Sequence, residues 1–139
     1  MRENIGLFRG LQPDVERFKW VFGGLVKTKD PFGGEDVYTI VDKIGNRTPV
    51  GSDSIGECTG LTDSDGRMIF ENDIVEVKDH HSTFASQVLY VAFEDGEFVL
   101  KSKSYDLYRS SLRLACRGES YQCRVIGFML NGTELYECR

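Results

Sequence analysis

Apolar and polar residues alternate with a period of two along much of the chain, which is the pattern of half-buried strands. In the N-terminal part, Trp20–Lys27 is an apolar run interrupted by two adjacent glycines, and it predicts a strand with a bend. Phe8–Gly10 is expected to pair with that run, and the β-branched stretch Asp36–Asp42 predicts another strand. Residues 44–56 are dense in turn-forming types. The N-terminal part is therefore expected to be a small β segment.

The clearest local signal lies in the C-terminal half. Two β-rich runs, Val88–Phe93 and Glu97–Lys101, flank the dipeptide Asp95-Gly96. Because Asp-Gly favours the turn whose twist matches paired strands, these runs predict a hairpin. Asp73–Val77 predicts a short strand with one solvated face, and Tyr121–Leu130 predicts a final strand.

The segment between the hairpin and the final strand fits two patterns. Tyr105, Tyr108, Leu112 and Ala115 fall on one helical face, yet the alternate positions from Leu112 to Cys116 also suit a strand. A short helix capped by Ser104 and leading into a strand would satisfy both patterns. Several short strands around one core favour a small closed barrel, which also removes exposed sheet edges.

The stretch "TGLTDSDGRMIFENDIVEV" (Thr59–Val77) is acidic and rich in turn residues, and three interpretations compete. Asp63 and Asp65 have the spacing of calcium-loop ligands, but Gly66 comes too early and no further ligand follows. Glu71 and Asp73 could form a catalytic carboxylate pair, yet no nucleophile arrangement stands beside them.

The third interpretation is a structural corner. Gly60 and Gly66 can supply positive-φ turns, and Asn72 tolerates the left-handed region. Ile69 and Phe70 would then enter the core before the next strand begins. We favour this interpretation, and it predicts no metal ion, no cofactor and no catalytic residue.

Composition narrows the class of protein. The chain has 139 residues, of which 40% are hydrophobic, so it can build one domain with a real core. No apolar run approaches the roughly 18 residues of a membrane span, and the first ten residues lack the apolar core of a secretory signal. Four cysteines without zinc-ligand spacing are interpreted as reduced, structural thiols. We therefore expect a cytoplasmic protein that contacts no membrane.

The net charge of −5 argues against a protein that coats DNA, but the charge is uneven. Residues 101–124 hold six basic side chains against two acidic ones. If 107–116 is helical, three arginines four residues apart form a stripe, and nearby tyrosines could stack on bases. The candidate patch for nucleic acid or an acidic partner comprises Lys101, Lys103, Tyr105, Tyr108, Arg109, Arg113 and Arg117. The alternative is a solvated basic face that pairs with the acidic remainder.

Few residues in the sequence support an enzymatic interpretation. "HHSTF" places His80 and His81 beside hydroxyl groups in an expected loop, but adjacent histidines on an extended segment point to opposite sides. They therefore make a poor joint metal site, and we do not expect an enzyme.

The segment "SIGECTGLTDSDGRMIFENDIVEV" resembles the central motif of the YopX family of phage and prophage proteins. Two further pieces support the resemblance: "FRG" with the later Trp-Val-aromatic-Gly run, and "RVIGFMLNGTELYE" near the C-terminus. Departures are Cys58 in place of an aromatic residue, Asn72 in place of a glycine, and no proline after Asn131. The matching positions are Gly56, Thr59, Gly60, Leu61, Asp63, Gly66, Ile69, Phe70, Glu71, Asp73, Ile74 and Val75.

The resemblance implies one YopX-like domain that is mostly β. Residues 1–58 would form an N-terminal β subdomain and residues 59–139 an SH3-like barrel. It also implies a phage- or prophage-encoded protein in a bacterial cytoplasm, without an established activity, and its motif residues look like fold-makers.

Two functions compete on this basis. The first is a non-enzymatic module that binds a host or phage protein, with a candidate surface at Trp20, Phe22, Phe32 and Tyr38 unless these are simply core. The second is nucleic-acid binding through the basic stretch. Unpaired strands in the N-terminal segment also make a homo-oligomer an open alternative.

Overall fold

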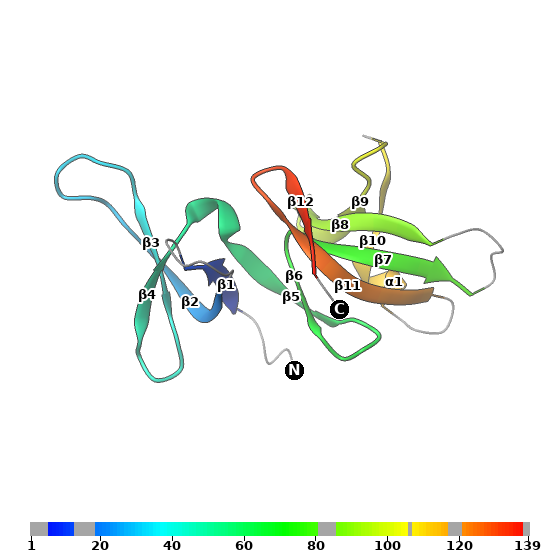
Figure 1. Cartoon of the computed structure of the whole chain (residues 1–139), viewed down its shortest axis with the longest axis horizontal. Helices are drawn as coiled ribbons and strands as arrows, with labels where there is room; N and C mark the ends of the chain where they lie inside the picture. Colours follow the sequence, from blue (N-terminus) through cyan, green and yellow to red (C-terminus); the bar gives the residue numbers. More distant parts are fainter. Residues whose placement is uncertain (1–5, 13–18, 81–85, 106, 117–120, 138–139) are drawn as a thin grey trace. The chain divides into compact units, whose positions relative to one another are not determined.

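The computed structural model describes residues 6–12, 19–80, 86–105, 107–116 and 121–137. The chain divides into two compact units, Met1–Cys58 (unit 1) and Thr59–Arg139 (unit 2). The described residues are mostly in antiparallel strands, which confirms the prediction of a mostly β fold (Figure 1).

Unit 1 is built on strands in the order β4-β3-β2-β1-β5. Their bounds are β1 Phe8–Leu11, β2 Trp20–Thr28, β3 Val37–Val41, β4 Arg47–Val50 and β5 Gly56–Thr62, with a 3-10 turn η1 at Ser52–Ser54. β5 extends past the boundary into unit 2, where it pairs with β6 (Met68–Phe70) to complete a six-stranded sheet.

The predicted pairing of β1 with β2 is confirmed, with Phe8 opposite Gly23. β2 exchanges partners at its two glycines, because its pairing with β1 ends at Gly23 and its pairing with β3 begins at Gly24. A Cβ atom on Gly23 would lie 2.1 Å from the carbonyl oxygen of Val41, so only glycine fits there.

The strand β4 was not expected from its turn-rich sequence. It contains Pro49 and lies at the end of the sheet, pairing with β3 alone among the described strands. Proline is tolerated on an end strand because its missing N–H breaks no ladder bond on the outer side. Val50, at the end of β4, is buried together with Leu11 and Ile40 in the core of this unit.

Unit 2 contains a second six-stranded sheet in the order β10-β9-β8-β7-β11-β12 (Figure 1). The strands are β7 Asp73–Asp79, β8 Gln87–Glu94, β9 Glu97–Lys101, β10 Arg109–Ser111, β11 Tyr121–Leu130 and β12 Thr133–Tyr136.

The predicted hairpin is confirmed as β8 and β9. Asp95 has φ 51° and Gly96 has φ 83°, which is the left-handed pair that an Asp-Gly turn requires.

The expected helix and strand occur in the opposite order. Strand β10 comes first, and the helix α1 (Leu112–Ala115) follows it directly. The helix is capped by Ser111, whose Oγ accepts a hydrogen bond from the backbone N–H of Leu114, and not by Ser104. Leu112 decides the arrangement, because its side chain is fully buried at the first helical position.

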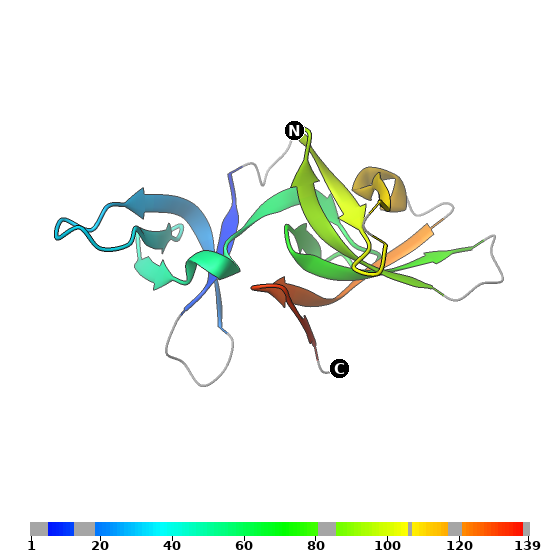
Figure 2. The same cartoon turned by 90° about the horizontal axis from the view of Figure 1, so that it is seen from above.

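The SH3-like barrel is not confirmed. Among the strands that the structure describes, β10 and β12 pair with one neighbour each, so the sheet is not closed by hydrogen bonds. The short helix α1 packs against both β9 and β11 (Figure 2).

One hydrophobic core fills unit 2 between the sheet, β6 and α1. Burying a leucine or valine side chain contributes about 1.5–3 kcal/mol, so this core dominates the stability of the unit. The cluster comprises Ile69, Val75, Val77, Leu89, Val91, Leu100, Leu112, Ala115, Cys123 and Val125. Neither short helix in the described ranges is long and apolar enough to cross a membrane.

Candidate functional site

The acidic turn of the central motif is a structural corner. The buried carboxylate of Asp63 accepts hydrogen bonds at Oδ1 from the backbone N–H groups of Asp65 (3.0 Å) and Arg67 (2.8 Å). Its Oδ2 accepts from the backbone N–H of Val125 in β11 (2.9 Å). Arg67 in turn forms a two-pronged ion pair with Glu137. Asp63 therefore ties the turn to a distant strand and is fully engaged by donors.

A second corner follows at Phe70–Asp73. Asp73 is 1% exposed and its Oδ2 accepts a hydrogen bond from the backbone N–H of Phe70 (2.8 Å). Asn72 has φ 73°, as its position in the motif predicted, and its backbone groups bond to Val91 and Met129. The carboxylate of Asp73 thus stabilises the backbone of its own turn.

The remaining motif residues support the same corner. Gly60 and Gly66 have φ of 80° and 83°, and the hydroxyl of Thr59 donates to the carbonyl oxygen of Ile69 at 2.8 Å. Leu61 packs against the core of unit 2. The structure buries Gly56, Ile69, Phe70, Ile74 and Val75.

The basic stretch does not form the expected stripe. Arg109 lies on β10 and Arg113 on α1, so no continuous helix aligns them, and Arg117 lies outside the described residues. Arg109 donates from Nη1 to Asp95 at 2.7 Å and from Nη2 to Glu97 at 3.4 Å.

The two lysines are also held near acids. Lys101 pairs with Glu94, and Lys103 lies 3.7 Å from Glu134. Such pairing weakens the positive potential that would attract phosphates. Tyr105 is exposed, whereas Tyr108 is half-buried.

The candidate aromatic surface of unit 1 is divided. The guanidinium of Arg9 lies 4.0 Å from the ring centroid of Trp20, and the ammonium of Lys27 lies 5.9 Å from that of Tyr38. Phe22 and Phe32 are exposed, by 42% and 95%. Phe22 and Phe32 are therefore not core residues.

No metal centre is assembled in the part of the chain that the structure describes, where no three His, Cys, Asp or Glu side chains gather. His80 is exposed at the end of the β7 segment, and His81 lies outside the described residues. Cys58, Cys116 and Cys123 are not joined in disulfides among the residues that the structure describes.

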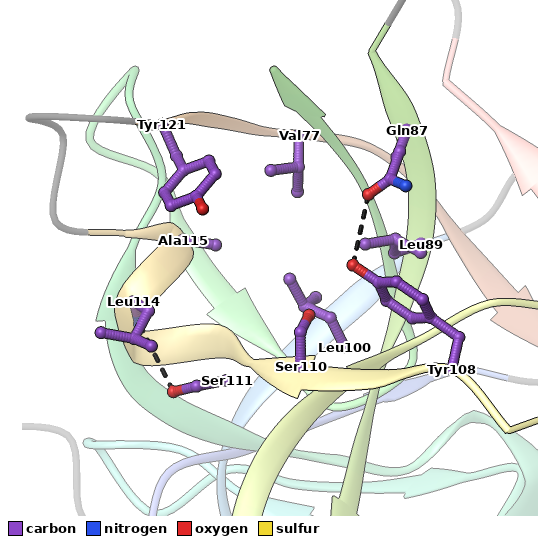
Figure 3. Close-up of a pocket in the computed structure, with 10 residues that line it drawn as sticks. All are labelled: Val77, Gln87, Leu89, Leu100, Tyr108, Ser110, Ser111, Leu114, Ala115 and Tyr121. Atoms are coloured by element: carbon purple, nitrogen blue, oxygen red, sulfur yellow. Dashed lines mark hydrogen bonds between the residues drawn. The ribbon is translucent and has the colours of Figure 1, made fainter. Parts of the chain in front are cut away.

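A pocket of about 420 Å³, including its open mouth, lies in unit 2 between the ends of β7 and β8, β10 and α1 (Figure 3). The described side chains that line it are all uncharged. The apolar members are Val77, Leu89, Leu100, Leu114 and Ala115, and the polar members are Gln87, Tyr108, Ser110, Ser111 and Tyr121.

Hydrogen bonds fix the rim of this pocket. The hydroxyl of Tyr108 donates to Oε1 of Gln87 at 3.2 Å, and the ring of Tyr121 lies across the pocket from it (Figure 3). Leu114 is 52% exposed at the mouth. The described side chains of the site offer apolar contact and neutral hydrogen-bonding groups.

Sequence reasoning did not find this pocket, because its walls come from five separate segments between residues 77 and 121. The one available signal was the ambiguity of residues 105–116, whose pattern fits both a helix and a strand. Tyr108 had been assigned to the basic patch, and it instead lines the pocket.

A family model described as YopX protein matches residues 14–137. No curated protein matches the chain.

Proposed function

The chain belongs to the YopX family, and from that premise we propose that it is a non-enzymatic binding module that takes an apolar side chain of a partner polypeptide. The family suggests a phage-type protein of poorly defined function. The proposal extends this to a phage- or prophage-encoded protein that binds a host or phage protein in the bacterial cytoplasm.

The observation that carries the proposal is the uncharged pocket. The cavity itself has a volume of about 120 Å³, below the roughly 300–1,000 Å³ found for pockets that hold whole small-molecule ligands, so it suits a single side chain. An aliphatic or small aromatic side chain fits this size and matches the floor of Val77, Leu89 and Leu100. A charged group would lose hydration without gaining an ion pair, which disfavours it.

Two features favour a polypeptide as the source of that side chain. Ser110 and Ser111 line the pocket from β10, which ends its sheet and, among the described strands, pairs only with β9. An extended peptide can use such an edge for backbone hydrogen bonds while its side chain enters a neighbouring pocket. Leu107, which is 99% exposed beside this strand, adds apolar surface outside the pocket for further contacts.

We also infer that unit 2 is related to SH3-like folds in an open form. Strands β7 to β10 form a meander, a short helix follows, and β11 returns to pair with β7. This connectivity supports the relation, although the hydrogen-bonded sheet stays open.

Nucleic-acid binding has less support. Three of the basic residues in the candidate patch, Lys101, Lys103 and Arg109, are each paired with a carboxylate. The predicted helical stripe of arginines, which would follow a phosphate backbone, is not formed by the described residues Arg109 and Arg113.

The test uses a displayed library of random peptides, selected on the full chain. We expect enriched peptides to share one leucine, isoleucine or phenylalanine whose change to aspartate abolishes binding. The bound peptide should shift the backbone NMR signals of Leu100, Ser110 and Ala115.

Leu114→Glu is the sharpest variant for this test. Position 114 is the third residue of α1, where Glu can reach back to the cap at Ser111, so the helix is retained while a charge enters the mouth. Losing the burial of one side chain should weaken binding by roughly 10- to 150-fold. Arg113→Glu is the matched control, since it places the same acid on the same helix outside the lining.

Equal affinity of the selected peptides for the Leu114→Glu variant would contradict the proposal. So would signal changes confined to the exposed Phe22 and Phe32 of unit 1. If no peptide is enriched and apolar small molecules shift the same signals, the occupant is a small ligand instead of a polypeptide.

A further inference from the structure

The hairpin that joins β11 to β12 turns at the dipeptide Asn131-Gly132. Leu130 pairs with Thr133, so the loop consists of these two residues alone. Asn131 has φ 49° and Gly132 has φ 79°, which is the left-handed pair of a primed hairpin turn. Both residues are exposed, so solvent reaches the side-chain amide and the peptide bond that follows it.

A lysine from another segment lies against this turn. Nζ of Lys103, which follows the end of β9, donates a hydrogen bond to the carbonyl oxygen of Gly132 at 3.1 Å. The same ammonium lies 3.7 Å from Oε1 of Glu134 in β12. A positive charge in this position favours negative charge on the neighbouring backbone. The turn therefore combines an exposed amide, a following residue without a Cβ atom, and a nearby cation.

We propose that Asn131 is a site of spontaneous deamidation, promoted by Lys103, at which the native chain converts the side-chain amide into aspartate or isoaspartate. Water is the co-reactant. The modification goes beyond the proposed binding function, since neither residue of the turn lines the pocket.

The reaction proceeds through a cyclic imide. The backbone nitrogen of Gly132 gives its proton to water or hydroxide and attacks Cγ of Asn131. A C–N bond forms, the bond from Cγ to Nδ2 breaks, and Nδ2 takes up a proton and leaves as ammonia. Water then opens the succinimide ring at one of its two carbonyl carbons. Opening at one carbon gives aspartate, and opening at the other gives isoaspartate, in which the main chain runs through the former side chain.

The fold permits ring closure at this turn. Asn131 must leave the left-handed region for its Cγ to meet the next nitrogen, so the turn has to open locally. Such opening costs little at the end of a sheet, and β12 is a strand of four residues that pairs with β11 alone among the described strands. Gly132 adds no Cβ that would hinder the attack. The ammonium of Lys103 favours the deprotonated nitrogen that attacks.

The other two asparagines among the described residues are internal references. Asn46 precedes Arg47 and Asn72 precedes Asp73, so a side chain hinders ring closure at both positions. Asn72 is also held in its corner by hydrogen bonds at its backbone N–H and its carbonyl oxygen. We therefore expect both residues to convert more slowly than Asn131.

The experiment incubates the native full chain in neutral and in mildly alkaline buffer, with samples taken over time for tryptic digestion and mass spectrometry. Cleavage after lysine and arginine places the three asparagines on separate peptides, 44–47, 68–78 and the peptide that begins at residue 125. Electron-transfer fragmentation distinguishes isoaspartate from aspartate. We expect conversion first on the peptide that begins at residue 125, and faster in alkaline buffer, because the attacking nitrogen must lose its proton.

Two lysine variants test the promoting charge. Lys103→Ala should slow the conversion of Asn131 by about two- to five-fold, which is the size of effect expected from one charge at the surface. Lys78→Ala is the matched control, since it removes an exposed lysine of β7 and should leave the rate unchanged.

The product provides a second measurement. Isoaspartate adds one atom to the main chain of a two-residue loop, so amide hydrogen exchange at Leu135 and Tyr136 in β12 should become faster in the isolated isoaspartyl form. Asn131→Asp is its control, because it introduces the carboxylate without lengthening the main chain and should keep the protection of β12.

Three results would overturn the proposal. In the first, Asn131 stays an amide in the native chain but converts in the chain unfolded by urea, which means that the fold protects the turn. In the second, Asn46 or Asn72 converts before Asn131. In the third, Lys103→Ala converts as fast as the unsubstituted chain, which removes the promoting role of the lysine.

Discussion

Replacing Asp63 by alanine should destabilise unit 2 more than any other single change in the acidic turn. The carboxylate accepts three backbone hydrogen bonds, and the one from Val125 joins segments 62 positions apart. Truncation removes the two oxygens that accept these three hydrogen bonds, and all three donors remain. The N–H of Val125 is then left in a buried position, since its residue is 0% exposed.

The magnitude follows from the surroundings of each donor. A buried donor left without an acceptor costs about 1–3 kcal/mol. The donors at Asp65 and Arg67 lie in a surface turn where water can replace the carboxylate, so each costs about 0.5–1.5 kcal/mol. The expected loss is about 2–6 kcal/mol, a large part of the roughly 5–15 kcal/mol that stabilises a typical domain.

The assay is urea unfolding followed by two signals. Trp20 is the only tryptophan and reports unit 1, whereas the backbone amide exchange of Val125 reports unit 2. Asp63→Ala should lower the unfolding midpoint of the unit 2 signal and speed exchange at Val125. Asp65→Ala, an exposed acid in the same turn, is the control and should change stability by less than about 0.5 kcal/mol. Equal effects of the two substitutions would refute the bracing role of Asp63.

Two further predictions concern backbone geometry. Gly23→Ala should break the β2–β3 pairing of unit 1, because the added Cβ would clash with the carbonyl oxygen of Val41. Gly24→Ala is the control, since a Cβ there meets nothing within 4 Å. Amide hydrogen exchange on β3 should become faster only in Gly23→Ala, and equal protection in the two variants would contradict the close approach. Gly96→Val should cost about 1–2 kcal/mol of unfolding free energy, because a β-branched residue is strained at φ 83°. Gly96→Asn should cost much less, and thermal unfolding of the two variants side by side checks the difference.

Local turn chemistry made part of the fold predictable. Asp95, Gly96 and Asn72 are residue types that adopt the left-handed backbone conformation readily, so the hairpin and the second corner follow from a few residues. Strand β4 could not be predicted, because Pro49 and the turn-forming residues around it favour a loop. Its strand conformation depends on pairing with β3. A local sequence pattern does not show which strand a segment will pair with.

Long-range packing decided the rest. The order of β10 and α1 depends on Leu112 entering a core built mostly from other strands, and no local period encodes that. The sequence pattern groups Arg109 with the basic residues near it in the chain. In the structure its hydrogen-bond partners Asp95 and Glu97 belong to the preceding hairpin. The pocket depends on such non-local placement for all its walls, which explains why motif spacing did not predict it.

The position of β11 between β7 and β12 has a consequence for synthesis of the chain. During synthesis, β7 leaves the ribosome before β11 does. The edge of β7 that pairs with β11 therefore stays uncovered until Tyr121–Leu130 has emerged. Local hairpins such as β8–β9 can form during that interval, because they close short loops. Completion of the unit requires a late, distant closure by β11, and until then Ile69 and Val75 lack part of the layer that shields them from water and from neighbouring nascent chains.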